Sequence, residues 1–299
     1  KKSLGHLLKG SQMKYEHIEK NRLRFGIQKM CRALHVSSSG YYRWRKSGDS
    51  KRDIENRKLL WQIRLIHKKH KQRYGSPRIT DELQDNGYNF SENRIARLMS
   101  KNGIAAKTKR KFKVTTNSKH NLPIADNIVN GNFSASALNC LWTSDITYIW
   151  TSEGWLYLCA VLDVFNRQIV GWSMDNRMTQ DLVINALQQA VWRRKPGSGC
   201  IFHSDRGSQY AGHKFRKLLS KHKFIQSMSG KGNCYDNAIM ETFFHTLKTE
   251  LIYFESYQTR REAKKSVFEY IEMYYNRIRK HSALNYKSPL DFERLAGVA

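Results

Sequence analysis

The stretch LWTSDITYIW, residues 141–150, indicates the fold more clearly than any other part of the sequence. It is rich in β-branched and aromatic residues, which favour strands, and Ser152-Glu153-Gly154 follows it as a turn. Two further strand-like runs come next, at residues 155–162 and 168–172. Because the connections are short, the three runs predict an antiparallel meander.

Helical and strand patterns alternate after this meander. In chain order we expect a helix over residues 179–192, a strand over 200–203, a helix over 210–222, a strand over 224–225 and a helix from Asn237. Three antiparallel strands followed by alternating helices and strands predict an α/β domain with a mixed five-stranded sheet.

Three acidic residues fall where such a sheet could bring them together. Asp145 lies in the first strand, Asp205 directly after the fourth, and Glu241 in the helix after the fifth. Loops at the carboxyl ends of strands in α/β sheets often form ligand sites. Carboxylates are the hard oxygen ligands that Mg²⁺ prefers, and a few of them can hold two ions about 4 Å apart for phosphoryl transfer. Spacing alone supports the trio weakly, because the chain has 25 acidic residues.

The charge of the chain indicates a polyanionic partner. Lys and Arg number 53 against 25 Asp and Glu, a net charge of +28, and residues 1–120 carry most of the surplus. A basic front end on a more neutral body is typical of proteins that bind nucleic acid. No apolar run is long enough to span a membrane. The five cysteines are scattered without C-x-x-C spacing, which favours a reducing cytoplasm over a disulfide framework.

Residues 13–50 have the pattern of a helix-turn-helix module. Apolar residues at Ile27, Met30, Cys31 and Leu34 form one helix face, and the serines at 37–39 can cap a second helix that mixes aromatic and basic residues. Two core-packing helices with a solvated basic face would give the same pattern. If the module binds DNA, the expected contacts are Ser39, Tyr41, Tyr42, Arg43 and Arg45.

Four further segments complete the expected organisation. Residues 51–106 form a second helical DNA-binding module, 107–136 a basic linker, 137–253 the catalytic core and 254–299 a helical extension. The linker could lie along a phosphate backbone or be a solvated connector; the contacts would be Lys107, Lys109, Arg110 and Lys111. In the extension, the apolar spacing from Val267 to Ile278 favours core packing, with a dimer contact as the alternative. Tyr275, Arg279 and His281 could also face DNA.

Several motifs together resemble those of one family. They are Cys31-Arg32-Ala33-Leu34, Ser39-Gly40-Tyr41-Tyr42-Arg43-Trp44, Arg73-Tyr74-Gly75-Ser76-Pro77-Arg78-Ile79, Trp142-Thr143-Ser144-Asp145-Ile146-Thr147-Tyr148, His203-Ser204-Asp205-Arg206-Gly207-Ser208-Gln209-Tyr210, Asp236-Asn237-Ala238 with Glu241, and Tyr275-Asn276-Arg277-Ile278-Arg279. On these motifs the chain resembles transposases of bacterial insertion sequences with a retroviral-integrase-like core. The specific match is the third insertion-sequence family, which two overlapping reading frames encode.

The resemblance implies an RNase H-like fold with a DDE triad of Asp145, Asp205 and Glu241 that binds two Mg²⁺, for which Mn²⁺ can substitute. It implies cleavage and strand transfer at the ends of the element, a copy-out-paste-in route through a circular intermediate, and integration at a target. Lys248 would contact DNA near the scissile phosphate; an ordinary exposed helix lysine is the alternative. The family's upstream leucine zipper has no counterpart here, so we expect a second-frame product starting near Met13 or a truncated fusion.

The implied partners are double-stranded DNA, as terminal repeats and target, and further copies of the chain in a dimer or higher multimer. The first-frame product is another expected partner, and the expected location is the bacterial cytoplasm, on the nucleoid. Two other functions remain open from sequence. One is an RNase H-like nuclease that cuts without strand transfer, and the other is a DNA-binding regulator without catalytic activity.

Overall fold

The computed structural model describes residues 10–47, 50–107, 122–230 and 237–297. The chain divides into two compact units. The helical unit comprises residues 1–71 and 83–104, and the sheet unit comprises residues 72–82 and 105–299. Within the described ranges, no helix is both long and apolar enough to cross a membrane.

The helical unit begins with three helices that pack on one small core. They are α2 (Ser11–Asn21), α3 (Ile27–Ala33) and α4 (Ser38–Ser47). The core consists of Ile18, Met30, Cys31, Leu34 and Tyr41. The α3–α4 pair is the helix-turn-helix outline expected from the sequence, and the Gly40 N–H donates to Ser37 Oγ at 3.2 Å at the start of α4.

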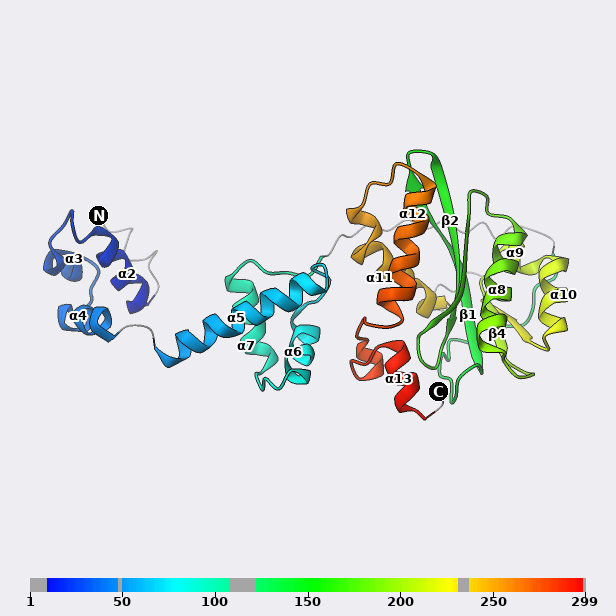
Figure 1. Cartoon of the computed structure of the whole chain (residues 1–299), viewed down its shortest axis with the longest axis horizontal. Helices are drawn as coiled ribbons and strands as arrows, with labels where there is room; N and C mark the ends of the chain where they lie inside the picture. The colour runs from blue at the N-terminus through cyan, green and yellow to red at the C-terminus, as the bar shows by residue number, and fades with distance from the viewer. Residues whose placement is uncertain (1–9, 48–49, 108–121, 231–236, 298–299) are drawn as a thin grey trace. The chain divides into compact units, whose positions relative to one another are not determined.

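Two further helices continue this unit, α5 (Lys51–Lys69) and α7 (Glu92–Lys101) (Figure 1). Ser50 caps α5 by accepting a hydrogen bond from the Asp53 N–H at 3.1 Å. Arg94 links the two helices, since its Nη2 donates to Asn56 Oδ1 at 2.8 Å. Helix α6 (Ser76–Asp85) begins in the sheet unit and ends in the helical unit.

The sheet unit contains the mixed five-stranded sheet that the sequence predicts. Its strands are β1 (Leu141–Thr151), β2 (Gly154–Asp163), β3 (Ile169–Asp175), β4 (Ile201–Ser204) and β5 (Ile225–Met228), in the order β3-β2-β1-β4-β5. Strands β1, β2 and β3 pair antiparallel, and β4 and β5 continue the sheet in parallel with β1. This is the sheet of an RNase H-like fold.

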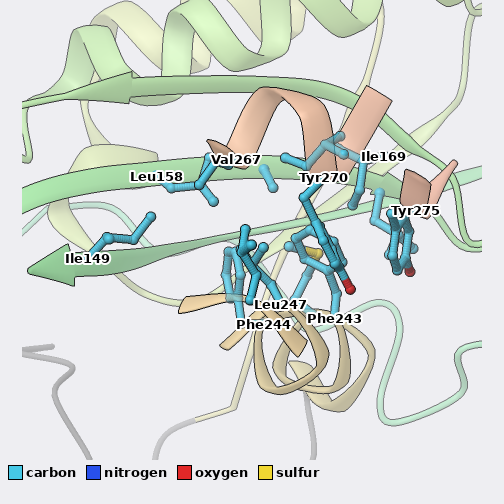
Figure 2. Close-up of a cluster of buried hydrophobic side chains, with 14 of the residues drawn as sticks. Ile149, Leu158, Ile169, Phe243, Phe244, Leu247, Val267, Tyr270 and Tyr275 are labelled. Atoms are coloured by element: carbon cyan, nitrogen blue, oxygen red, sulfur yellow. The ribbon is translucent and has the colours of Figure 1, made fainter. Parts of the chain in front are cut away.

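Helices cover both faces of the sheet (Figure 1). On one face lie α8 (Gln180–Arg194), α9 (Ser208–Ala211) and α10 (His213–Lys221), around a core that includes Trp142, Val161, Ala186, Phe202 and Phe215. On the other lie α11 (Ala238–Glu250) and α12 (Arg260–Phe268), around the apolar cluster shown in Figure 2. Alternate residues of β1 contribute to the two cores, as expected for a strand buried on both faces.

The C-terminal extension differs from the single helix that its apolar spacing suggests. Helix α12 passes into a π-helical segment, η3 (Glu269–Tyr275), and then come η4 (Ser282–Leu284) and α13 (Pro289–Leu295). Val267 and Ile271 are buried in the core, as predicted, whereas Ile278 is exposed. Tyr275 and Arg279 are also buried, so the alternative that they face DNA is wrong.

Candidate active site

The pairing of β1 with β4 places Asp145 beside Asp205. The two strands run parallel, and their last paired residues are Ser144 and Ser204. Asp145 and Asp205 are the next residues on each chain. Neighbouring strands lie about 4.8 Å apart and equivalent positions share a face, so both carboxylates emerge together from the same face of the sheet.

Backbone groups orient the two carboxylates. The Ile146 N–H donates to Asp145 Oδ1 at 2.7 Å, and the Gly207 N–H donates to Asp205 Oδ1 at 3.0 Å. Burial and the nearby Asp205 carboxylate raise the pKa of Asp145 well above its ordinary value, although the Ile146 N–H opposes this shift. A bound cation would stabilise the ionised form of this pair.

Buried hydrogen bonds fix the start of α11 against β1. Thr143 Oγ1 donates to Asn237 Oδ1 at 2.7 Å, and Asn237 Nδ2 donates to the Ser144 carbonyl at 3.4 Å. Asn237 immediately precedes α11, and Glu241 lies in the first turn of that helix. These contacts hold the Glu241 end of α11 next to the strand that carries Asp145.

Glu241 has a weaker electrostatic effect on Asp145 than Asp205 has. Its charge raises the pKa of Asp145, but less than Asp205 does, and burial raises the pKa of Glu241 itself. Among the residues that the structure describes, no three acidic, histidine or cysteine side chains are placed to share one metal ion. The structure thus brings Asp145 and Asp205 together and leaves Glu241 on the adjacent helix turn.

Lys248 is a positively charged residue whose charge acts on Asp145. It follows Glu241 by two helical turns and so shares its side of α11. Its Nζ lies 4.9 Å from the centroid of the Tyr148 ring. Burial lowers the pKa of Lys248, and the Asp145 carboxylate opposes that shift. The side chain is half-buried between β1 and α11, unlike a fully solvated helix lysine.

A buried polar layer beneath Asp145 was not identified from the sequence. The hydroxyls of Ser144 and Tyr210 lie 2.9 Å apart, and the Cys159 thiol lies within 3.6 Å of the Tyr210 hydroxyl. Burial raises the pKa of Cys159 to about 12, so the thiol stays neutral. Ser144 and Tyr210 both belong to the sequence motifs that contain the aspartates, and this shared membership could have identified them as part of the site.

The opposite end of α11 is held by a buried ion pair. Glu250, the last residue of α11, accepts from Arg279 Nη2 at 2.7 Å and from the Tyr270 hydroxyl at 2.8 Å. Arg78 Nη1 lies 3.7 Å from the same carboxylate, and Arg73 Nε donates to the Glu250 carbonyl at 3.1 Å. Residues 72–82 of the sheet unit therefore anchor the helix that carries Glu241.

The residues expected to contact DNA in the N-terminal module are mostly exposed on α4. Ser39, Tyr42, Arg43 and Arg45 all have accessible side chains. Tyr41 does not: its side chain is fully buried and its hydroxyl donates to Glu19. Tyr41 is thus a core residue, and its assignment as a DNA contact was wrong because an aromatic residue in a short amphipathic helix also serves the core.

The expected linker contacts are only partly described. Lys109, Arg110 and Lys111 lie outside the described residues. Lys107 is described: its backbone N–H donates to the Gln72 carbonyl at 2.9 Å, and its Nζ lies 5.0 Å from the centroid of the Phe254 ring. At least this first basic residue is held against the sheet unit.

Family models match three parts of the chain. Residues 135–234 and 241–295 match models described as integrase core domains, and residues 53–112 match one described as an HTH-like domain. The first two ranges contain Asp145, Asp205 and Glu241.

Two curated relatives cover most of the chain. Transposase InsF for insertion sequence IS3A of Escherichia coli (strain K12) is 44% identical over 283 residues, 94% of this chain and 98% of the relative. The uncharacterized 31 kDa protein of insertion element IS600 from Shigella sonnei is 43% identical over 263 residues, 88% of this chain and 97% of the relative.

Solved structures show a more distant likeness. A chain of the simian T-cell lymphotropic virus intasome in complex with the PP2A regulatory subunit B56 gamma has a TM-score of 0.46 at 15% identity, covering 77% of this chain and 73% of that chain. The HTLV-2 integrase catalytic core domain in complex with magnesium has a TM-score of 0.41 at 15% identity, covering 53% of this chain and 99% of that chain.

Proposed function

This chain belongs to the IS3 family of insertion-sequence transposases, and from that premise we propose that it cleaves and joins DNA strands at the ends of its element through Asp145, Asp205 and Glu241. The observation that carries the proposal is that Asp145 and Asp205 directly follow the last paired residues, Ser144 and Ser204, of two neighbouring parallel strands. Glu241 follows on a helix whose start is hydrogen-bonded to the same strand.

The residues of the site fit a hard divalent cation. Their donors are carboxylate oxygens, and the raised pKa of Asp145 reflects burial and the nearby Asp205 carboxylate, both of which a bound cation would offset. Asp145 and Asp205 would hold Mg²⁺, with Glu241 completing the ligand set for two ions; Mn²⁺ has the same preference for oxygen and would substitute. When bound, the metal would stabilise charge on the attacking and leaving oxygens of an in-line displacement.

The protein's own groups then orient the reaction. The N–H groups of Ile146 and Gly207 fix the two carboxylates, and Lys248 would contact a phosphate next to the scissile bond. In the first step, water attacks the phosphodiester at one element end, and the bond to the 3′ oxygen breaks to free a 3′ hydroxyl. In the second, that hydroxyl attacks the same strand near the other end and displaces another 3′ oxygen.

The branched product defines a copy-out-paste-in route, in which replication yields a circular element that is later integrated. Its DNA partners would be the terminal repeats and the target. Contacts would come from Ser39, Tyr42, Arg43 and Arg45 on α4 and from the basic linker that starts at Lys107. Two ends must meet in one complex, so we propose at least a dimer on DNA, with the first-frame product as a further partner. The reaction would take place in the bacterial cytoplasm, on the nucleoid.

The products formed on a plasmid that carries the parent element test this proposal. The full chain should give joined ends and circular element in Mg²⁺, whereas a nuclease without strand transfer would give nicks alone. The Glu241→Gln variant should lose both nicking and joining and still bind element ends in a gel-shift assay. A variant that binds DNA and keeps its activity would contradict the assignment of Glu241.

A further inference from the structure

An aromatic cluster with two exposed tryptophans lies on the β1–β2 hairpin, beyond Asp145 on the same strand. The cluster consists of Tyr148, Trp150 and Trp155. Trp150 and Trp155 face each other across the hairpin, with ring centroids 4.8 Å apart, and Tyr148 lies 5.0 Å from Trp155 in an edge-to-face arrangement. Trp150 is 60% exposed and Trp155 is 42% exposed. Two neighbouring tryptophans that both remain open to solvent are costly for a soluble surface unless they contact a partner.

The cluster is linked to the proposed site through Lys248. The described pairing of β1 with β4 ends at Ser144, so the part of β1 that follows Asp145 is bonded to β2 on one side. Trp150 lies five residues beyond Asp145, about 17 Å along an extended strand, and the odd spacing places the two side chains on opposite faces of β1. A DNA strand that contacts both would cross the edge of β1 next to Lys248. Lys248, whose charge acts on Asp145, places its Nζ over the Tyr148 ring. The ammonium group therefore contacts one ring of the cluster and acts electrostatically on Asp145.

Charge near the cluster favours a nucleic-acid occupant. Lys248 is joined by Arg260, whose Nε donates to the Trp155 carbonyl at 3.1 Å. The acidic residue of the turn, Glu153, accepts a hydrogen bond from the Arg260 N–H at 2.8 Å. Aromatic rings flanked by cations match a single strand, because each base offers a flat π face and each nucleotide a phosphate.

We propose that Tyr148, Trp150 and Trp155 form a stacking site for unpaired bases of the DNA strand whose phosphodiester reaches Asp145 and Asp205. This inference rests on the proposed function for the identity of the strand. A terminal base pair must open for its phosphodiester to enter a site between a sheet and a helix, and the opened bases lose their stacking partners. Exposed tryptophans replace those partners for any base sequence.

Binding to two DNA probes tests the site without requiring chemistry. One probe is a short blunt duplex, and the other is the same duplex with a few unpaired thymidines at one 3′ end. The full chain should bind the forked probe about tenfold more tightly, as expected when a base stacks on an aromatic ring. The double variant Trp150→Ala/Trp155→Ala should lose this preference and keep its affinity for the blunt duplex, and Trp150→Phe/Trp155→Phe should retain part of the preference.

Trp192 supplies the matched control. It is 77% exposed on α8 and lies outside the cluster, so Trp192→Ala should keep the full preference for the forked probe. Unpaired thymidines should quench the tryptophan fluorescence of Trp192→Ala and leave that of the double alanine variant unchanged.

Three results would overturn the proposal: no fork preference in the parent chain, an unchanged preference in the double alanine variant, or an equal loss of affinity for both probes. A change in oligomer mass with an unchanged fork preference would assign the cluster to a protein contact instead. Because these assays measure binding alone, a chain that binds forks but joins no ends would contradict the proposed function and leave the stacking site intact.

Discussion

Arg279 and Glu250 form a buried ion pair at the end of α11, with Nη2 2.7 Å from Oε1 and Nε 3.0 Å from both carboxylate oxygens. Each side chain has 7% of its surface exposed or less. The Glu250 carboxylate raises the pKa of Arg279 above its ordinary value despite burial, so the Arg279 guanidinium stays charged. The same helix carries Lys248 two residues before Glu250 and Glu241 in its first turn, which links this pair to the active site.

Replacing Glu250 with Gln should destabilise the sheet unit by about 3 kcal/mol, because the change leaves the Arg279 charge buried without its counter-ion. Chemical denaturation monitored by circular dichroism measures the effect. Glu269→Gln is the control, since Glu269 is exposed in the adjacent π-helical segment. Equal denaturation midpoints for the two variants would show that the pair contributes no net stability.

Tyr74→Phe should cost about 1–2 kcal/mol of the free energy of unfolding. The fully buried Tyr74 hydroxyl accepts from the Lys280 N–H at 2.9 Å, and the change would leave that donor buried without its partner. The exposed Tyr42 provides the comparison, and Tyr42→Phe should unfold with the parent chain. If Tyr74→Phe had the same free energy of unfolding as the parent chain, residues 72–82 would not be an integral part of the sheet unit.

The sheet could be predicted because each strand has a recognisable local sequence pattern. The contacts of Glu250 with Arg279 and of Tyr74 with Lys280 could not. The β-branched run at 141–150 and the turn residues after it define a hairpin within a short window, and the aspartates lie within it or directly after a similar run. Tyr74 and Lys280 are separated by more than 200 residues. The periodicity of a single helix or strand carries no information about a contact between such distant residues. For the same reason, the sequence leaves open that Arg279 and Tyr275 face DNA, whereas both are buried.

Metal-free protein should become less stable as the pH rises from about 4 toward neutrality. The pKa of Asp145 is higher in the folded chain than in the unfolded chain, so the folded state binds the proton more tightly over this range and loses that advantage as the proton leaves. Asp145→Asn removes the titrating group and should melt a few degrees above the parent chain at neutral pH in EDTA. Identical melting curves across the range would contradict the raised pKa.

Added Mg²⁺ should make the parent chain melt at a higher temperature than Asp145→Asn. A ligand that binds only the folded state stabilises it by about 2.7 kcal/mol at a concentration one hundred times its dissociation constant. The melting temperature of the parent chain should therefore rise with Mg²⁺, whereas those of Asp145→Asn and Asp205→Asn should stay constant. Thermal shift with MgCl₂ measures the difference, and Na₂SO₄ at matched ionic strength controls for salt. Equal shifts in all three proteins would place the cation elsewhere.

Asn237 should act as a positioning residue for Glu241. Asn237→Ala removes the hydrogen bonds to Thr143 and Ser144 that hold the start of α11, so strand joining should fall about tenfold or more while DNA binding is kept. A positioning role further predicts that the Mg²⁺ concentration for half-maximal joining rises, and that Asn237→Asp, which keeps the acceptor for Thr143, recovers part of the activity. Asn176→Ala, at an exposed position, should match the parent chain in both readouts.

Strand joining by Asp205→Asn, compared with Asp181→Asn, tests most directly that the Asp145–Asp205 pair is the catalytic centre. Both variants replace one carboxylate with an amide, but Asp181 is exposed on α8. On a plasmid carrying the parent element in Mg²⁺, Asp181→Asn should form joined ends as the parent chain does. Asp205→Asn should form them about a thousandfold more slowly, since several kcal/mol of charge stabilisation is lost. Equal joining by the two variants would contradict the account.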